Sequence, residues 1–349
     1  MTNKKNSFSR RDFLATTAKG AALVSTAGLY HSCKSGTKTE KEQIPEQIPE
    51  QISDQSSGPM PKRILGKTGL EVSILSFGGG SQFLKNKNGE WEKHLEESIK
   101  SGINLFDTSP DYTVVSRDGT KALTSEERFG EILPAYRDDI IISTKINERE
   151  GDLARKSVEE SLTRMKTDYI DLLMLHSVDE KDSVSEIEGG VYAEMVKMKS
   201  EGMVRHIGFS SMDSAQRSGD LLEALDFDMA ILALNPSRYG DYLGLAFPVA
   251  TEKNVGIIAM KVVRDIVGKT ASAEELLEYS WGQEGVASSV VGHVGIDILK
   301  ENIRLAVAYG NKPTATIDRE ELEARLAPYA GPHALCWARP GYRDGGIVV

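Results

Sequence analysis

The sequence predicts an α/β fold, a (β/α)8 TIM barrel with an N-terminal β-hairpin. Three observations support this prediction. Eight short apolar runs, suited to strands buried on both faces, alternate with longer amphipathic stretches. The segment 62–349 is close in length to a single barrel of about 250 residues with additions. No G-x-G-x-x-G pattern follows an apolar run, so a doubly wound dinucleotide-binding sheet is not indicated.

The predicted elements follow one another in regular order. Residues 63–65 and 70–73, separated by a Gly-Lys-Thr-Gly turn, are typical of a hairpin before the first barrel strand. Gly102 and Gly202 stand where helix C-caps are expected. Helical patterns between the strands include residues 91–101, 153–165, 192–200 and 214–225. The eight barrel strands are predicted at 74–77, 103–106, 139–144, 169–175, 205–209, 229–234, 256–260 and 286–291.

Composition excludes several classes of protein. Apolar residues make up 40% and charged residues 27%, which is ordinary for a globular enzyme and unlike a disordered or collagen-like chain. The formal net charge is −10, so the chain is a poor candidate for binding nucleic acid through its phosphates. Two cysteines, Cys33 and Cys336, are too few for a disulfide scaffold, a cysteine-rich zinc site or a four-thiolate iron–sulfur cluster, and the sequence indicates no metal site.

Residues 1–33 have the pattern of an export signal. Ser9-Arg10-Arg11-Asp12-Phe13-Leu14 precedes a mildly apolar stretch that is too weakly hydrophobic for a spanning helix. This pattern resembles a twin-arginine signal, which the twin-arginine export machinery reads as an address. We therefore expect an exported, periplasmic protein. The alternative is an exposed basic helix.

Cys33 follows the apolar stretch directly. A small residue precedes it, as lipoprotein processing requires, but Tyr30 replaces the aliphatic residue usual in such sequences. The sequence leaves open whether Cys33 carries a lipid that anchors the protein to a membrane or is discarded with the signal. Residues 34–61 contain a repeated Glu-Gln-Ile-Pro pattern with few apolar side chains, which predicts a flexible linker. The barrel domain is predicted at 62–349.

Four titratable residues stand at or just after the ends of successive predicted strands. Asp107 ends the second strand and Tyr112 follows it in the loop, while Lys145 ends the third strand and His176 the fourth. Each has an ordinary structural explanation taken alone. Because the chemistry of such a barrel lies at the C-terminal ends of its strands, their joint placement indicates an active site.

The motifs around these four residues resemble those of the aldo-keto reductase family. They are Phe-Asp-Thr-Ser-Pro-Asp-Tyr at 106–112, Ser-Thr-Lys at 143–145 and Asp-Leu-Leu-Met-Leu-His at 171–176. The resemblance extends from residue 62 to about residue 307. It implies a (β/α)8 barrel and reversible NAD(P)-dependent conversion between a carbonyl compound and an alcohol.

The four residue types suit carbonyl reduction, which requires hydride at carbon and a proton at oxygen. Tyr112 is the predicted general acid and base, and a neighbouring cation, Lys145, is expected to lower its pKa. Asp107 would hold the ammonium in place by a charge-assisted hydrogen bond. His176 would donate a hydrogen bond to the substrate oxygen and orient the carbonyl.

The strands after His176 depart from the family pattern where the nicotinamide is expected. Ser210 matches the pattern, but Ser211 replaces its asparagine and Ile231 stands where a glutamine is usual. Met260 and Lys261 occupy the position of an aromatic residue that stacks on the ring, and methionine is polarizable enough to pack there.

The region after the eighth strand lacks the basic residues that hold the 2′-phosphate of NADP in many members. Gly292 is followed by His293, which carries a positive charge only when protonated, and Ile298 replaces an arginine. Asn302 is retained and would contact the adenine. NAD is therefore slightly favoured over NADP. The predicted cofactor contacts are Gly78, Gly79, Ser210, Ser211, Met260, Lys261, Gly292 and Asn302.

The sequence thus predicts an exported aldo-keto reductase that acts on a small-molecule carbonyl or alcohol. The polar loop 113–124 is longer than usual and suggests a sugar or another polar carbonyl compound, and the alternative is a solvated loop without a role in substrate binding. Residues 337–342 are candidates to cover the cavity. Because a periplasm holds little free cofactor, we expect a cofactor that is loaded before export and retained. The alternative is a cofactor-binding sensor or accessory subunit with little turnover.

Overall fold

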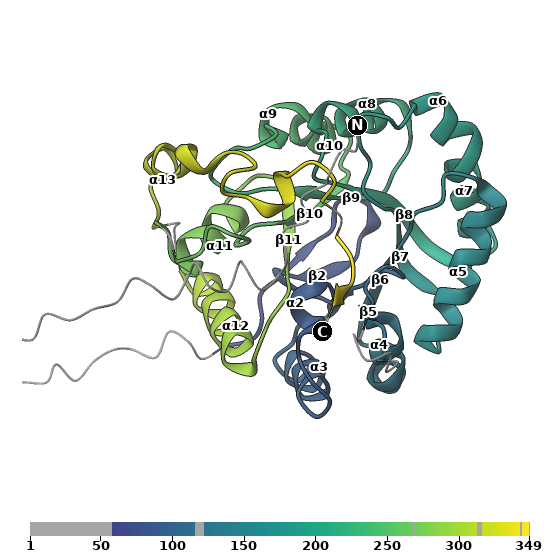
Figure 1. The fold of residues 1–349 in the computed structure, drawn as a ribbon, viewed down its shortest axis with the longest axis horizontal. Coiled ribbons are helices and arrows are strands. Elements are labelled where there is room, and N and C mark those ends of the chain that lie inside the picture. The colour runs from purple at the N-terminus through teal and green to yellow at the C-terminus, as the bar shows by residue number, and fades with distance from the viewer. Residues whose placement is uncertain (1–57, 116–121, 269, 313–315, 343, 349) are drawn as a thin grey trace, which may run out of the picture. The chain divides into compact units, whose positions relative to one another are not determined.

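In the computed structural model, the described residues are 58–115, 122–268, 270–312, 316–342 and 344–348. The predicted signal peptide, Cys33, most of the predicted linker and part of the polar loop after Tyr112 lie outside these residues. Within them, eight strands close into a barrel (Figure 1). Neighbouring strands are parallel throughout and follow chain order around the barrel, which confirms the predicted fold class. The barrel strands are β3 (Leu75–Gly78), β4 (Leu105–Asp107), β6 (Ile141–Ile146), β7 (Ile170–Leu175), β8 (Val204–Ser211), β9 (Met229–Ala233), β10 (Gly256–Met260) and β11 (Val286–Val291).

Helices cover the outside of the barrel (Figure 1). Two of them begin at capping boxes, in which the side chains of Thr124 and Ser272 accept hydrogen bonds from backbone N–H groups of the first helical turn. Gly102 and Gly202 follow helices with φ of +86° and +79°, as expected for C-cap glycines. The helices are α2 (Ser81–Leu84), α3 (Trp91–Lys100), α4 (Ser125–Ile132), α5 (Gly151–Met165), α6 (Val184–Ile187), α7 (Ala193–Ser200), α8 (Ala215–Ala224), α9 (Tyr242–Leu245), α10 (Phe247–Glu252), α11 (Ala273–Trp281), α12 (Ile296–Gly310) and α13 (Arg319–Leu326).

An antiparallel hairpin of β1 (Lys62–Ile64) and β2 (Glu71–Ser73) closes the N-terminal end of the barrel. Its Leu65 and Val72 are fully buried and belong to the cluster of side chains inside the barrel. Arg63 donates hydrogen bonds to the carbonyl oxygens of Trp281 and Val286, 2.7 and 2.8 Å away. The hairpin therefore seals one end of the barrel and leaves the other end for a site.

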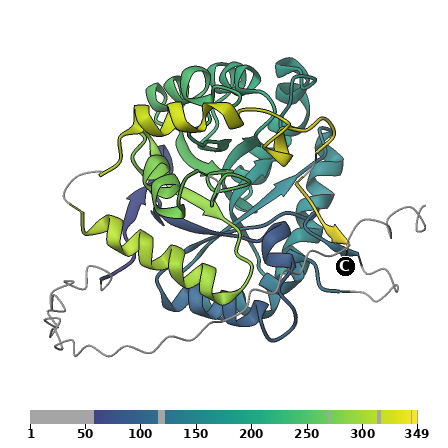
Figure 2. The ribbon, with the colours of Figure 1, turned by 60° about the vertical axis from the view of Figure 1, so that its left-hand side comes forward.

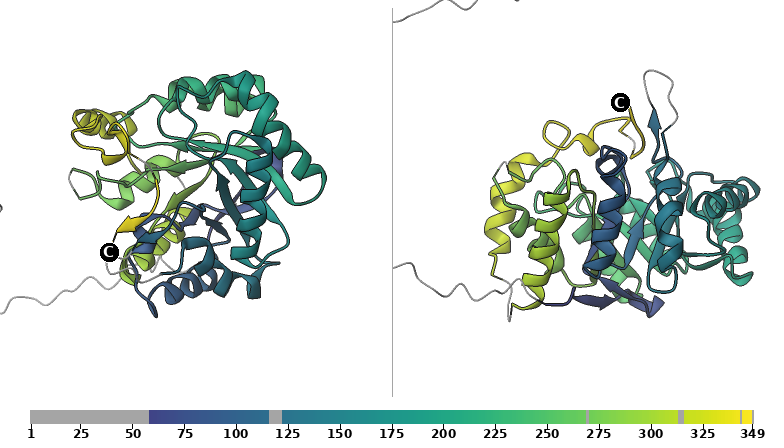
Figure 3. Two further views of the ribbon diagram at one scale, coloured as in Figure 1. Left: turned by 45° about the vertical axis from the view of Figure 1, so that its right-hand side comes forward. Right: turned by 90° about the horizontal axis from the view of Figure 1, so that it is seen from below.

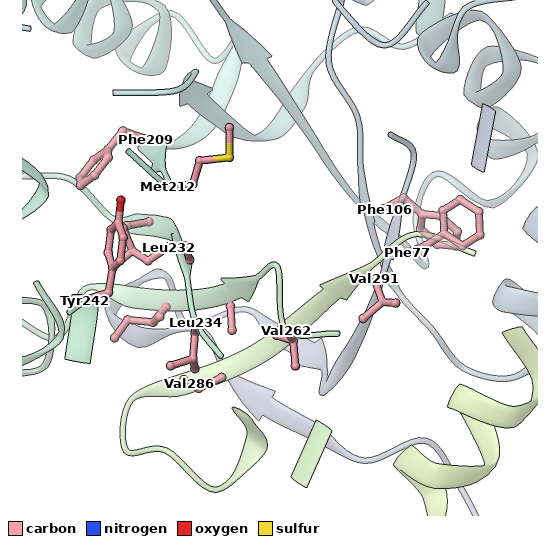
Figure 4. Packing of buried hydrophobic residues seen from close by; sticks show 14 of the residues in the cluster. Phe77, Phe106, Phe209, Met212, Leu232, Leu234, Tyr242, Val262, Val286 and Val291 are labelled. Carbon is pink, nitrogen blue, oxygen red and sulfur yellow. The ribbon is translucent and has the colours of Figure 1, made fainter. Parts of the chain in front are cut away.

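A second, larger apolar cluster fills the layer between strands and helices. Figure 4 shows part of it, with Phe77 of β3 beside Phe106 of β4 and with Phe209 and Leu232 on the neighbouring β8 and β9. The rings of Phe77 and Phe106 lie 5.6 Å apart, and each is fully buried. This packing on both faces explains why the strands read as continuous apolar runs.

The C-terminal segment returns to the end of the barrel opposite the hairpin (Figure 3). Its last strand, β12 (Ile347–Val348), pairs in parallel with β5 (Val114–Val115) in the loop after Tyr112 (Figure 2). Because β5 follows β4 directly, this pairing brings the end of the chain to the C-terminal ends of the barrel strands.

Candidate active site

The four residues at the predicted strand ends meet at one cavity of about 140 Å³. Asp107 is the last residue of β4, Lys145 lies on β6, His176 directly follows β7, and Tyr112 lies in the loop after β4. At most 6% of any of these residues is exposed. The parallel register of β4, β6 and β7 brings side chains that are far apart in sequence to the same end of the barrel.

Lys145 and Asp107 form a buried ion pair. The Lys145 Nζ donates to both carboxylate oxygens of Asp107, at 2.8 and 2.7 Å, and to the backbone oxygen of Thr108 at 2.7 Å. Ser143 donates a further hydrogen bond to Asp107 Oδ1 at 2.8 Å. All three protons of the ammonium are therefore directed to fixed acceptors, so its position is tightly determined.

The Tyr112 ring lies beside this ion pair, with Lys145 Nζ 4.9 Å from the ring centroid. Burial raises the pKa of Tyr112 well above its ordinary value, and the carboxylates of Asp344 and Asp107 raise that pKa further. The expectation that Lys145 lowers this pKa is therefore not met, because Asp107 neutralises the ammonium and the ring is shielded from water. Tyr112 is a protonated phenol at neutral pH, the form that can donate a proton.

His176 is neutral. Burial and the positive charge of Lys145 lower the pKa of His176 to about 3. Its Nδ1 lies 3.0 Å from Asn147 Oδ1 and 3.4 Å from Ser109 Oγ, and its ring meets that of Tyr112 edge to face at 6.1 Å. These contacts set the orientation of an imidazole that lines the cavity.

The predicted cofactor contacts divide into two groups. Those that line the cavity with the four residues above are Gly78, Ser210, Met260, Lys261 and Gly292. The remaining three, Gly79, Ser211 and Asn302, are not among its lining residues.

The structure gives a packing reason for two of these three residues. A Cβ at Gly79 would lie 2.4 Å from Ser125 Oγ, so the glycine is needed for the approach of α4 to the barrel. The buried hydroxyl of Ser211 donates to the backbone oxygen of Val178 at 2.8 Å and lies 3.0 Å from the hydroxyl of Tyr242. Ser211 thus links elements of the fold.

The cavity has features that suit a dinucleotide. Gly80 also lines it and lies beside Tyr112, since a Cβ at this glycine would meet the Tyr112 ring at 3.5 Å, an ordinary van der Waals contact. Arg264 also lines the cavity, and its guanidinium reaches Ser81 Oγ at 3.5 Å, where a diphosphate would find a bidentate donor. Met260 offers a polarizable surface to a planar ring.

His293 does not provide a positive charge at neutral pH. It is fully buried beside the ring of Phe77, and burial lowers the pKa of His293 to about 3. Neither ring nitrogen has a hydrogen-bond partner among the described residues. A 2′-phosphate near this position would therefore meet a neutral imidazole.

Asp344 is the principal cavity residue that sequence reasoning missed. Its carboxylate accepts hydrogen bonds from Lys261 Nζ at 2.5 and 2.6 Å and from the hydroxyl of Tyr342 at 2.9 Å. The one available signal was the glycine-flanked polar turn at residues 341–346, which does not indicate its partner in the barrel. Sequence reasoning also did not identify Asn147 beside His176 or Arg264 in the cavity wall.

The described part of the chain contains no group of three or more His, Cys, Asp or Glu side chains arranged to hold a metal ion. No helix in the same part combines the length and apolar character needed to cross a membrane.

Comparison with known proteins adds an independent line of evidence. The model of the Aldo/keto reductase family matches residues 75–269, more than half of the chain. An uncharacterized oxidoreductase of Bacillus subtilis is 27% identical over 71% of this chain and 92% of its own length. The L-galactose dehydrogenase of Arabidopsis thaliana is 36% identical over 43% of this chain and 48% of its own length. The L-glyceraldehyde 3-phosphate reductase of Escherichia coli is 31% identical over 58% of this chain and 61% of its own length.

Solved structures give the same picture. A putative aldo-keto reductase from Pseudomonas aeruginosa superposes with a TM-score of 0.59 at 28% identity, covering 71% of this chain and 95% of that one. The holo form of an aldo-keto reductase from Bacillus halodurans is similar in fold, with a TM-score of 0.61 at 23% identity over 78% of this chain and 96% of its own.

Proposed function

The chain belongs to the aldo/keto reductase family of oxidoreductases, and on this premise we propose that it is an exported, NAD(P)-dependent reductase that interconverts a polar carbonyl compound and its alcohol. The observation that carries the proposal is the cavity in which a buried, protonated tyrosine lies beside a neutral histidine and a fixed lysine–aspartate pair. Sugar substrates are supported by two similar proteins, the L-galactose dehydrogenase above and a D-threo-aldose 1-dehydrogenase from Pseudomonas that is 28% identical over 62% of this chain.

Each residue has a distinct task in the proposed reaction. A bound reduced nicotinamide supplies hydride to the carbonyl carbon. Tyr112 gives its phenolic proton to the carbonyl oxygen, so that the carbonyl becomes an alcohol. His176 sets the orientation of the same oxygen by donating from Nε2. This requires the neutral tautomer in which Nδ1 accepts a hydrogen bond from the Ser109 hydroxyl and the Asn147 amide presents its nitrogen to Nδ1. Lys145 and Asp107 form a fixed ion pair beside the Tyr112 ring, with Nζ 4.9 Å from the ring centroid, and this pair holds the ring in position for the proton transfer.

A conservative substitution of the tyrosine tests this assignment. Purified protein should reduce 4-nitrobenzaldehyde with loss of reduced-nicotinamide absorbance, and Tyr112→Phe should lower kcat by about 10²–10⁴-fold because the proton donor is absent. Tyr136→Phe is the matched control, since Tyr136 is 38% exposed and does not line the cavity. Equal rates for the wild type and Tyr112→Phe would contradict the role of Tyr112, whereas rates near background in both would support a cofactor-binding sensor with little turnover.

The preference for NAD over NADP is also part of the proposal. The neutral, fully buried His293 and the exposed, apolar Ile298 support it, because neither offers a positive charge to a 2′-phosphate. Fluorescence titration of the protein with NAD and with NADP should give the lower dissociation constant for NAD. Tighter binding of NADP would contradict it.

Export through the twin-arginine route is proposed from the motif at residues 9–14. Changing both Arg10 and Arg11 to lysine should leave unprocessed protein in the cytoplasm, and normal export of that variant would refute the route. Incorporation of labelled palmitate that disappears in Cys33→Ala would show a lipid anchor.

We further propose that the cofactor is loaded before export and retained through many turnovers, since slow release is the usual basis of tight binding. One substrate would reduce it and another, or the same molecule in an epimerisation, would reoxidise it. Protein from the exported fraction should release close to one dinucleotide per chain on denaturation after dialysis. Empty protein that binds added cofactor weakly would contradict retention while leaving the role of Tyr112 intact.

A further inference from the structure

The C-terminal segment places a carboxylate inside the cavity. Asp344 lines the cavity together with Tyr112, Lys145, His176 and Lys261, although no barrel strand carries it. The segment is held on both sides of Asp344. Before it, Trp337 is buried against Tyr239, and after it, β12 pairs with β5.

Asp344 is bound within the cavity by two side chains. Lys261 Nζ contacts both of its oxygens, and the Tyr342 hydroxyl donates to Oδ1. Only 9% of the Lys261 side chain and 17% of the Asp344 side chain are exposed. Lys261 has a φ of +63°, a left-handed conformation that non-glycine residues adopt at a cost, so the backbone is strained where this ammonium is presented to the cavity.

Each of the three cations among the described residues that line the cavity already has a partner, and Arg264 lies 3.7 Å from Asp265 Oδ1 and 3.5 Å from Ser81 Oγ. Of the two lysines that line the cavity, Lys145 is paired with Asp107 and Lys261 with Asp344. Asp344 is also the carboxylate with the largest electrostatic effect on Tyr112, ahead of Asp107. An anionic substituent on a substrate positioned at Tyr112 would therefore enter a poorly hydrated space next to an existing carboxylate, which is electrostatically unfavourable.

A neutral polyhydroxylated substrate interacts favourably with the same Asp344 carboxylate. A carboxylate accepts hydrogen bonds from hydroxyl groups at positions not used by Lys261 and Tyr342, and hydrogen bonds to ionised groups are stronger than neutral ones. Specificity arises as often from repulsion of the wrong ligand as from attraction of the right one.

We propose that Asp344 makes the cavity selective for uncharged, polyhydroxylated carbonyl compounds and against their phosphorylated or carboxylated counterparts, a specificity that rests on the reductase function proposed above. Lys261 and Tyr342 are its positioning residues. A barrel without the C-terminal segment would present Lys261 as a free cation and would favour the anionic compounds.

The test uses two substrates that differ in one phosphate, glyceraldehyde and glyceraldehyde 3-phosphate. Wild-type protein should show the higher kcat/KM for glyceraldehyde. Asp344→Asn should raise the ratio of kcat/KM for the phosphate over that for glyceraldehyde by about tenfold or more, because it removes the repelling charge and frees Lys261. A ratio within twofold of the wild-type value would overturn the proposal.

Two further variants isolate the cause. The double variant Lys261→Met, Asp344→Asn removes the freed cation as well, so the gain for glyceraldehyde 3-phosphate should be smaller than in Asp344→Asn alone. Asp139→Asn, an exposed carboxylate just before β6 at the other end of the barrel, should leave the ratio unchanged. If Asp344→Asn does not fold, as judged by circular dichroism, Asp344→Ser is measured in its place.

Binding measurements separate this proposal from the proposed function. If no variant turns over either substrate, the dissociation constant of glycerol 3-phosphate is measured by calorimetry with NAD present. Binding about tenfold or more tighter to Asp344→Asn than to the wild type supports the proposal, and equal binding overturns it. The proposal is also overturned if Asp344→Asn binds NAD about tenfold more tightly without a change in the substrate ratio, because Asp344 would then compete with the cofactor.

Discussion

Two lysine–aspartate pairs of the same chemistry occupy one cavity, but the chain builds them in different ways. Asp107 and Lys145 lie on neighbouring strands of the barrel, and the register of β4 and β6 fixes their separation. Lys261 follows β10, whereas its partner Asp344 lies 83 residues further along, in the C-terminal segment.

The Asp107–Lys145 pair is therefore part of the rigid barrel, whereas the Lys261–Asp344 pair depends on the position of the C-terminal segment. Breaking the Asp107–Lys145 pair leaves a charge inside strands that cannot move away from each other. Breaking the Lys261–Asp344 pair leaves the segment after Trp337 held at its end by the two-residue pairing of β12 with β5, which lies in the loop after Tyr112, so water can reach the remaining charge. We therefore expect the first pair to govern stability and turnover and the second to govern the choice of substrate.

The largest effect is expected from Asp107→Asn. Removing one partner of a buried ion pair costs about 3–5 kcal/mol of unfolding free energy, because the other charge is left without compensation. The ammonium of Lys145 also loses its fixed position beside Tyr112, so kcat should fall by about 10²-fold or more. Urea denaturation and steady-state rates with glyceraldehyde measure the two effects.

The comparison requires that Asp344→Asn behave differently in the same assays. Its kcat for glyceraldehyde should stay within about tenfold of the wild-type value. Equal losses in the two variants would show that the pairs have equivalent roles.

The next effect concerns acid stability. The charge of Lys261, with hydrogen bonds from Lys261 and Tyr342, lowers the pKa of Asp344 from 3.8 to about 2 although burial opposes the shift. A carboxyl with a lowered pKa stabilises the fold above its unfolded pKa, and this contribution is lost as pH falls from about 4 to about 2. Its size is roughly 2 kcal/mol, since one pKa unit corresponds to about 1.4 kcal/mol.

Urea denaturation between pH 4.5 and 2.5 tests this expectation. The wild type should lose stability more steeply than Asp344→Asn in that range. His293, with a pKa lowered to about 3, binds a proton only in the unfolded state between about pH 6.5 and 3 and lowers stability equally in both proteins. The pKa of His176 is also lowered to about 3, and the charge of Asp344 opposes that shift, so the contribution of His176 differs between the two proteins near and below pH 3. Parallel curves below pH 4 would show that Asp344 is not stabilised by its partners.

A smaller, local effect is expected in hydrogen exchange. The N–H of Ile347 donates to the backbone oxygen of Thr113 at 2.9 Å, which fixes the end of the segment. In Asp344→Asn this amide should exchange about tenfold faster, while amides of β6 and β7 keep their wild-type rates. Faster exchange throughout the barrel would mean that the C-terminal segment is not a separate unit of stability.

The smallest effect is expected from Tyr342→Phe. The variant removes one hydrogen bond to Asp344 Oδ1 and leaves both contacts with Lys261. The ratio of kcat/KM for glyceraldehyde 3-phosphate over glyceraldehyde should rise by roughly threefold, because a single hydrogen bond makes a small net contribution to holding the Asp344 carboxylate in place. A change as large as that in Asp344→Asn would assign the positioning of the carboxylate to Tyr342 alone.

Local patterns in the chain were enough to predict the barrel and the convergence of four site residues. Buried parallel strands require apolar runs, and consecutive βα units place all strand ends at one face, so Asp107, Lys145 and His176 could be assigned to that face from their positions after such runs. Tyr112 could be added because its loop begins at one of these ends.

Packing between distant segments decided the rest. Ser211 is the last residue of β8, directly after Ser210, yet a partner in the loop after β7 directs its hydroxyl away from the cavity. The pKa of Tyr112 is raised, because burial and Asp344 outweigh a lysine that Asp107 already neutralises. Asp344 itself stands in a short polar turn with no periodic pattern, and its contact with Lys261 exists only because the C-terminal segment folds back onto β5. Local sequence determines where strands begin and end, whereas charge and proton affinity depend on which distant groups the closed fold brings within a few ångströms.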